Sequence, residues 1–237
     1  MKQIRICIAL LGLVGMTGCT GAGMRMPGPT RHLSGAPPSS RMELPSATYK
    51  APAVKKQRSS RDAKRIAKGA GAWVGKSRLR HNGTTFRYDC SGFVNAAHAL
   101  AGEDLAHRNA AGMVKYAKSL GLYKRVGSPG VGDTVFWDNT HDRNKNGKWD
   151  DDFTHVGIVE RVDSDGTLHL IHLGGKGVVR MRMNLRRPDD YKDGDGKVLN
   201  SYLRRRTKKD KKHVKYLSGQ LYSGMASFWA EGKLASR

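Results

Sequence analysis

The chain has 237 residues, with 43 Lys and Arg against 20 Asp and Glu, which gives a formal net charge of +23. This length allows one good-sized domain with extensions, and no apolar run after the first two dozen residues is long enough to span a membrane. The basic residues are scattered without interleaved aromatics or a nucleic-acid-binding motif, so we expect no nucleic acid as a partner.

The N-terminus has the pattern of an export signal. Two cations precede an apolar run at residues 6–16, which is too short for a membrane span and typical of a signal-peptide core. The run ends Met16-Thr17-Gly18-Cys19 and resembles the bacterial lipobox, although Met16 stands where leucine is usual. The resemblance implies a signal peptide at 1–18 and a lipid on the Cys19 thiol. The alternative is an ordinary secreted protein that is cut nearby.

The cellular location follows from the same segment. Thr20 follows Cys19 in place of aspartate, and by family analogy this indicates the outer membrane, facing the periplasm. An exported basic protein meets anionic wall polymers and lipopolysaccharide first, so we expect anionic envelope polymers as partners. We expect the protein to be a monomer with an N-terminal lipid anchor in the membrane.

Three cysteines are present, Cys7, Cys19 and Cys90. If Cys7 leaves with the signal peptide and Cys19 is acylated, Cys90 has no disulfide partner in an oxidising compartment. A free cysteine in an exported protein is a candidate reactive thiol.

Residues 19–60 are rich in Gly, Pro and Ser and predict a disordered tether. The domain is expected to run from 61 to 237. It begins with a helix near Arg61 that buries Ile66, Ala70 and Trp73 and closes near Gly75.

A second helix is predicted after Asp89. The apolar residues repeat at helical spacing, Asp89 is a suitable N-cap, and Ala101-Gly102 ends the helix. Cys90 then falls in the first turn, where the helix dipole favours a thiolate. The opposing interpretation is a small buried hydrophobic residue.

Further elements predict an α+β domain. A helix is expected at 110–120 and strands at 134–137, 155–162, 167–172 and 177–183. Helices followed by an antiparallel meander favour a fold in which the cysteine helix packs on the sheet. Residues 184–214 form a basic insertion, predicted as a surface excursion, and apolar residues at 216–228 return to the fold.

The histidines differ in their suitability as a base for Cys90. His98 lies eight residues further along the same helix, about 12 Å away, so it is excluded and expected to be partly exposed. His155 stands at the first position of a strand, at the rim of the sheet. His169 and His172 lie on opposite faces of the next strand, and the alternation alone does not decide which of them points the way His155 does.

Three blocks in order resemble the NlpC-type bacterial cell-wall peptidases of the papain-like superfamily. The blocks are Asp89-Cys90-Ser91-Gly92-Phe93-Val94, Val131-Gly132-Asp133-Thr134-Val135-Phe136-Trp137 and His155-Val156-Gly157-Ile158-Val159.

The resemblance implies a papain-like fold with Cys90 as nucleophile and His155 as general base. It also implies a third residue after two apolar positions on the next strand, which selects His172 over His169. Members typically hydrolyse the amide between D-glutamate and a diamino acid in peptidoglycan stem peptides, so the chemistry needs no cofactor. The tyrosine that the family often has upstream of the cysteine is missing, since Leu79 or His81 occupies that region.

A loop between strands resembles the calcium loop of EF-hand type. Its candidate ligands are Asp142, Asn144, Asn146, the backbone carbonyl of Lys148, Asp150 and Asp152. Phe153 stands at position twelve, where a glutamate is expected. Calcium there would be structural, and the alternative is a turn-rich hairpin loop without metal.

Three functions therefore compete. The first is a cysteine peptidase that hydrolyses peptidoglycan stem peptides. The second is a peptidoglycan amidase of the related cysteine- and histidine-dependent amidohydrolase type, against which the Asp-Cys-Ser-Gly block argues. The third is a basic envelope-binding lipoprotein without catalysis, which the retention of Cys90, His155 and a third histidine disfavours.

Overall fold

The computed structural model describes residues 61–206, 208, 210 and 214–230. The predicted signal peptide, the lipidation site Cys19 and the tether up to residue 60 lie outside the described residues. Within the described part of the chain, none of the helices is both long and apolar enough to cross a membrane.

The helices and strands follow the predicted order. The helices are α1 (Arg61–Ala72), α2 (Cys90–Leu100) and α3 (Ala110–Ser119), with a short 3-10 helix η1 (Phe228–Ala230). The strands are β1 (Arg80–His81), β2 (Thr84–Thr85), β3 (Tyr123–Lys124), β4 (Thr134–Trp137), β5 (His155–Val162), β6 (Leu168–Gly174), β7 (Gly177–Met183) and β8 (Tyr222–Ala226). The α+β class is confirmed.

The main sheet is antiparallel, in the order β3-β8-β4-β5-β6-β7. The meander from β4 to β7 is the one predicted from the sequence. Two strands of this sheet were not predicted: β8 pairs with β4, and β3 pairs with β8. Both are short, and β8 contains Ser223 and Gly224, so neither carries a strong strand pattern.

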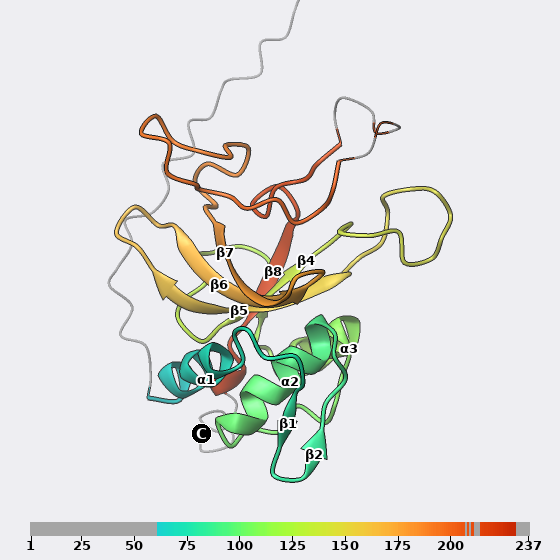
Figure 1. The fold of residues 1–237 in the computed structure, drawn as a ribbon, viewed down its shortest axis with the longest axis vertical. Coiled ribbons are helices and arrows are strands. Elements are labelled where there is room, and N and C mark those ends of the chain that lie inside the picture. The colour runs from blue at the N-terminus through green and yellow to red at the C-terminus, as the bar shows by residue number, and fades with distance from the viewer. Residues whose placement is uncertain (1–60, 207, 209, 211–213, 231–237) are drawn as a thin grey trace, which may run out of the picture. The chain divides into compact units, whose positions relative to one another are not determined.

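The three helices lie on one face of the sheet (Figure 1). Side chains alternate along each strand, so Phe136 joins the core beneath the helices while Val135 and Trp137 join a second core on the other face. All four residues of β4 are buried for this reason.

The second face is covered by the segment that follows β7 (Figure 1). Leu199 and Asn200 are buried, Leu185 and Leu203 pack against the second core, and Arg204 is only 6% exposed. The expectation that 184–214 is a surface excursion is therefore wrong for this part. The apolar positions of the segment are too few and irregular to form a periodic pattern, but they suffice to cover one face of a sheet.

Candidate active site

The N-terminus of α2 carries Cys90. Asp89 caps the helix, accepting hydrogen bonds from the Gly92 N–H and the Ser91 hydroxyl, each at 2.7 Å, and Arg87 pairs with its other oxygen. A side chain at Gly92 would bring a Cβ 1.9 Å from the Arg87 carbonyl oxygen, so the glycine permits the tight turn before the helix. The predicted N-cap and first-turn position are confirmed.

The surroundings of Cys90 raise the pKa of its thiol. Burial and then the negative charge of Asp89 raise its pKa to about 11, although the N–H groups of Val156, Ser91 and Cys90 act in the opposite direction. The N–H groups of the first turn favour a thiolate, as expected from the sequence, but burial and Asp89 act more strongly in the other direction. Loss of water around the sulfur outweighs the dipole of a short helix.

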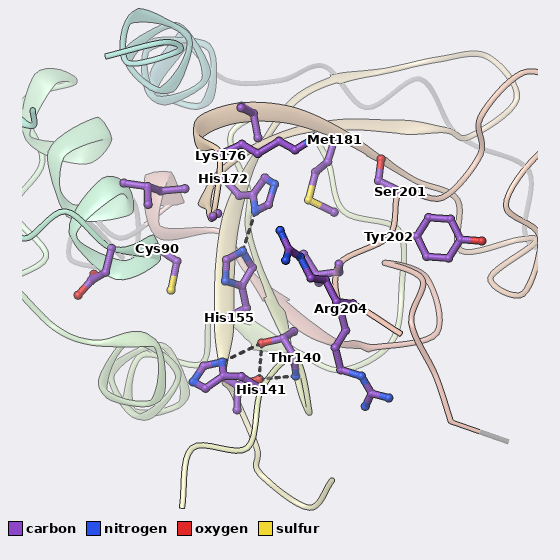
Figure 2. Close-up of a pocket in the computed structure, with 18 of the residues that line it drawn as sticks. Cys90, Thr140, His141, His155, His172, Lys176, Met181, Ser201, Tyr202 and Arg204 are labelled. Carbon is purple, nitrogen blue, oxygen red and sulfur yellow. Dashed lines mark hydrogen bonds between the residues drawn. The ribbon is translucent and has the colours of Figure 1, made fainter. Parts of the chain in front are cut away.

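His155 and His172 lie together. Nε2 of His155 and Nδ1 of His172 are 2.8 Å apart, and the two rings are nearly perpendicular (Figure 2). Gly157 leaves the room for this pair, because a Cβ there would lie 3.2 Å from the His172 Cβ and 2.9 Å from the Ile171 carbonyl oxygen. His169 is elsewhere, bonded to Asp163 and Arg161.

Both histidines are held in the neutral form. Burial lowers the pKa of His155 to about 3, with smaller contributions from His172 and His141, and burial lowers the pKa of His172 to about 4. A neutral imidazole has one N–H and one lone pair, so the His155–His172 bond uses one nitrogen of each ring.

His98 is not partly exposed as predicted from the sequence. It is completely buried beneath the sheet, packs edge-on against Phe228 and has a contact of 3.4 Å with the Thr134 hydroxyl. Burial lowers its pKa to about 3. The exclusion of His98 as the base for Cys90 is consistent with this position, since it does not line the cavity described next.

Cys90, His155 and His172 line one cavity of about 900 Å³. Figure 2 shows the Cys90 sulfur on one side of the two histidine rings and Met181, Ser201, Tyr202 and Arg204 on the other. The segment after β7 thus contributes a wall of the cavity, which sequence analysis missed. The run Arg204-Arg205-Arg206 was the one feature of the sequence that could have indicated this wall.

One group at the site is placed to donate a hydrogen bond to an oxyanion. Leu79 is buried in the core and His81 lies on β1, and neither lines the cavity. Tyr88 lines it, but its hydroxyl donates to the Lys76 carbonyl at 2.8 Å. The N–H of Cys90 itself, in the first turn of α2, is the group that can face an oxyanion.

Asp133 of the second sequence block is structural. It is buried and accepts hydrogen bonds from the Ser227 hydroxyl and the Trp229 indole, at 2.7 and 2.8 Å. Burial raises its pKa. It ties the segment directly after β8 to the residue before β4, beside the pairing of these two strands.

The loop of residues 142–153 fits calcium only in part. The side-chain oxygens of Asp142, Asn144 and Asn146 accept backbone N–H groups within the loop, and Gly147 has φ +77°. Asp152, however, is exposed, and it is the neighbouring Asp151 that turns inward, where it pairs with Arg143.

Among the described residues, no group of three or more His, Cys, Asp or Glu is arranged to hold a metal ion. Calcium binding stays a prediction, and no chemical step is routed through it.

Residues 80–173 match the family model of the CHAP domain. No curated protein and no solved structure matches the chain. CHAP domains occur among the NlpC/papain-like cysteine peptidases and amidases, so the predicted papain-like class is supported. The match includes Cys90, His155 and His172, and it indicates a hydrolase that acts on peptidoglycan, as an amidase or as a peptidase.

Proposed function

We propose that this protein is a cysteine peptidase that cleaves an amide bond in peptidoglycan stem peptides, between D-glutamate and the diamino acid. The observation that carries the proposal is the arrangement of one cavity: a cysteine at a helix N-terminus, and a histidine whose ring is fixed by a 2.8 Å hydrogen bond to a second histidine. A nucleophile, a base and a group that orients the base are what acyl transfer requires.

The tautomers assign the roles. When His155 carries its proton on Nε2, it donates to Nδ1 of His172, and the lone pair on Nδ1 of His155 is free for the thiol. Because the Cys90 pKa is raised and the His155 pKa is lowered, the resting pair is a thiol and a neutral imidazole. His155 therefore takes the proton as Cys90 attacks, instead of stabilising a thiolate formed beforehand.

The reaction then proceeds in two halves. The Cys90 sulfur bonds to the amide carbon, and the N–H of Cys90 donates to the oxyanion. His155 gives its new proton to the amine nitrogen as the C–N bond breaks, which leaves a thioester. Water, deprotonated by His155, attacks the thioester, and the carboxylic acid and the free thiol are released. His172 stabilises the imidazolium that forms twice in the cycle.

The proposal includes the envelope location predicted from the sequence. A lipid on Cys19 would anchor the domain at the outer membrane through the segment 19–60, where it meets peptidoglycan. Growth with a radiolabelled fatty acid tests this part, since wild-type protein should be labelled and Cys19→Ala should not.

A second candidate is a peptidoglycan amidase that cuts where the peptide joins the sugar. The CHAP match favours it equally with the peptidase, because that domain occurs in both. The two reactions share the site and the chemistry and differ only in the bond.

Mass spectrometry of digested muropeptides separates the two candidates. Wild-type protein should release fragments that end at D-glutamate, and Cys90→Ala should release none. Release of whole stem peptides would assign the amidase instead, and equal release by wild type and Cys90→Ala would contradict catalysis at this site.

A further inference from the structure

Positive charge is distributed unevenly around the cavity. Five of its lining residues are cationic, and we call them the basic wall: Lys176, Arg180, Arg204, Arg205 and Arg206. The one carboxylate among the lining residues is Asp89, which lies on the cysteine side and is already paired with Arg87. The cavity therefore favours a ligand that carries negative charge away from the cysteine.

Three members of the basic wall are available to such a ligand. Arg180 is engaged by Glu160 through two hydrogen bonds of 2.7 Å. Lys176, Arg205 and Arg206, in contrast, are exposed and have no hydrogen bond or ion pair within the part of the chain that the structure describes. Exposed guanidinium groups without a carboxylate partner suit the two-pronged binding of a carboxylate.

Arg204 fixes the segment that presents them. Its guanidinium carbon lies 3.6 Å from the centre of the Trp149 ring and 4.8 Å from that of Tyr216, and an Nη2 atom is 3.8 Å from an Asp210 oxygen. This side chain is only 4% exposed. A buried anchor directly before Arg205 and Arg206 keeps these two residues at the cavity, which lowers the conformational cost of binding.

The position of the basic wall identifies the half of the substrate that it meets. Figure 2 shows Arg204 on the side of the histidines away from Cys90, with Lys176 beyond His172. In the proposed reaction His155 protonates the departing amine, so a group on the histidine side belongs to the amine half of the scissile bond. The acyl half lies toward Cys90.

We propose that the basic wall is a carboxylate subsite for the amine half of the substrate. It selects a diamino acid that carries a free side-chain carboxylate over one that lacks it. This inference rests on the proposed peptidase function and adds the class of diamino acid. The basic wall belongs to this chain's own segment after residue 173, outside the match to the CHAP domain.

Three synthetic peptides test the subsite. They share L-Ala-γ-D-Glu and end in meso-diaminopimelic acid, in the same residue with its side-chain carboxyl as a primary amide, or in lysine. The wild-type protein should cleave the free acid with a kcat/KM about tenfold above the other two, as a charge-assisted hydrogen bond would give. The difference should reside in KM and shrink at high salt.

The variant Arg205→Gln/Arg206→Gln should lose most of this preference, because its kcat/KM for the free-acid peptide should fall toward its own value for the amidated peptide. Lys64→Gln/Lys68→Gln removes the same charge from the exposed face of α1 and is the matched control, which should keep the preference.

The outcomes separate the two proposals. Equal cleavage of all three peptides by wild type would overturn the subsite and leave the peptidase intact. No cleavage of any of them would overturn the peptidase. If the double variant loses activity equally on all peptides and also loses binding to vesicles that contain lipopolysaccharide, the basic wall binds the envelope generally, and the subsite is wrong.

Discussion

The two sides of the cavity are built in opposite ways. The catalytic wall, made of Cys90, His155 and His172, is half-buried, and burial raises the pKa of the thiol and lowers the pKa of both imidazoles. The basic wall comes from the β6–β7 turn, from β7 and from the segment after it, and three of its five cations are exposed and unpaired among the described residues. Reactivity is thus set by loss of water, whereas selection of substrate is left to charges that water still screens.

Among the tests of this difference between the two walls, we expect the largest effect on activity from replacement of His172. Replacement by alanine removes the acceptor that fixes the His155 ring, and we expect kcat to fall about 100-fold, at the lower end of general-base effects. His172→Gln, whose side chain also has an acceptor oxygen, should recover part of the loss. Hydrolysis of the free-acid peptide measures both.

His169→Gln is the control, because His169 lies outside the cavity and pairs with Asp163. If the loss in His172→Ala appeared in KM and not in kcat, or if His169→Gln matched it, His172 would not act as the positioning residue.

The second prediction concerns stability and pH. The pKa values of His98 and His155 are lowered to about 3 and that of His172 to about 4, from an ordinary value of 6.5. At a pH between the folded pKa values and 6.5, the unfolded chain binds more protons than the folded chain. The free energy of unfolding therefore falls as the pH falls from about 6.5 toward 4. Each histidine contributes up to about 1.4 kcal/mol per pH unit.

Urea unfolding at several pH values measures this slope. His98→Leu removes one titrating group from the core without touching the cavity, so the slope should decrease by about one proton. His107→Gln, at an exposed position, is the control and should leave it unchanged. An unchanged slope in His98→Leu would show that His98 is not held neutral.

The catalytic wall could be predicted from the sequence because each of its residues sits in a local pattern. An aspartate followed by cysteine and a helical repeat places Cys90, and a β-branched run after His155 places a strand. Sequence spacing left His169 and His172 open, and the family pattern selected His172, the one that the structure brings to His155.

The basic wall could not be predicted in the same way. Its position depends on packing between distant residues, such as Arg204 with Trp149, which no local period reveals. The burial of His98 and the raised pKa of Cys90 could not be predicted for the same reason. Both result from the packing of β4, β5 and η1 against α2.

The third prediction tests the anchor of the basic wall. Arg204→Met keeps a long side chain but loses the cation–π contacts with Trp149 and Tyr216, which should lower the free energy of unfolding by about 1–2 kcal/mol. A double-mutant cycle with Trp149→Ala isolates the pair, and we expect a coupling energy of about 1 kcal/mol. The preference for the free-acid peptide should fall as well. A coupling near zero would mean that Trp149 does not hold Arg204.

The smallest effect is expected from calcium at the loop 142–153. The loop is largely exposed, and Asp152 is exposed while Asp142 and Asn146 accept N–H groups within the loop, so any ion would be held weakly. We expect millimolar calcium, and not magnesium, to raise the melting temperature by a few degrees, because only the folded state presents the ligands.

Asp142→Asn should remove this calcium-dependent shift. Trp149 belongs to this loop and its ring stacks against Arg204. Calcium that orders the loop should therefore also increase the preference for the free-acid peptide. If calcium gave neither a thermal shift nor a heat of binding, the prediction that the loop binds calcium would be wrong. The basic wall would then depend on the packing of Arg204 against Trp149 and Tyr216 and on its ion pair with Asp210.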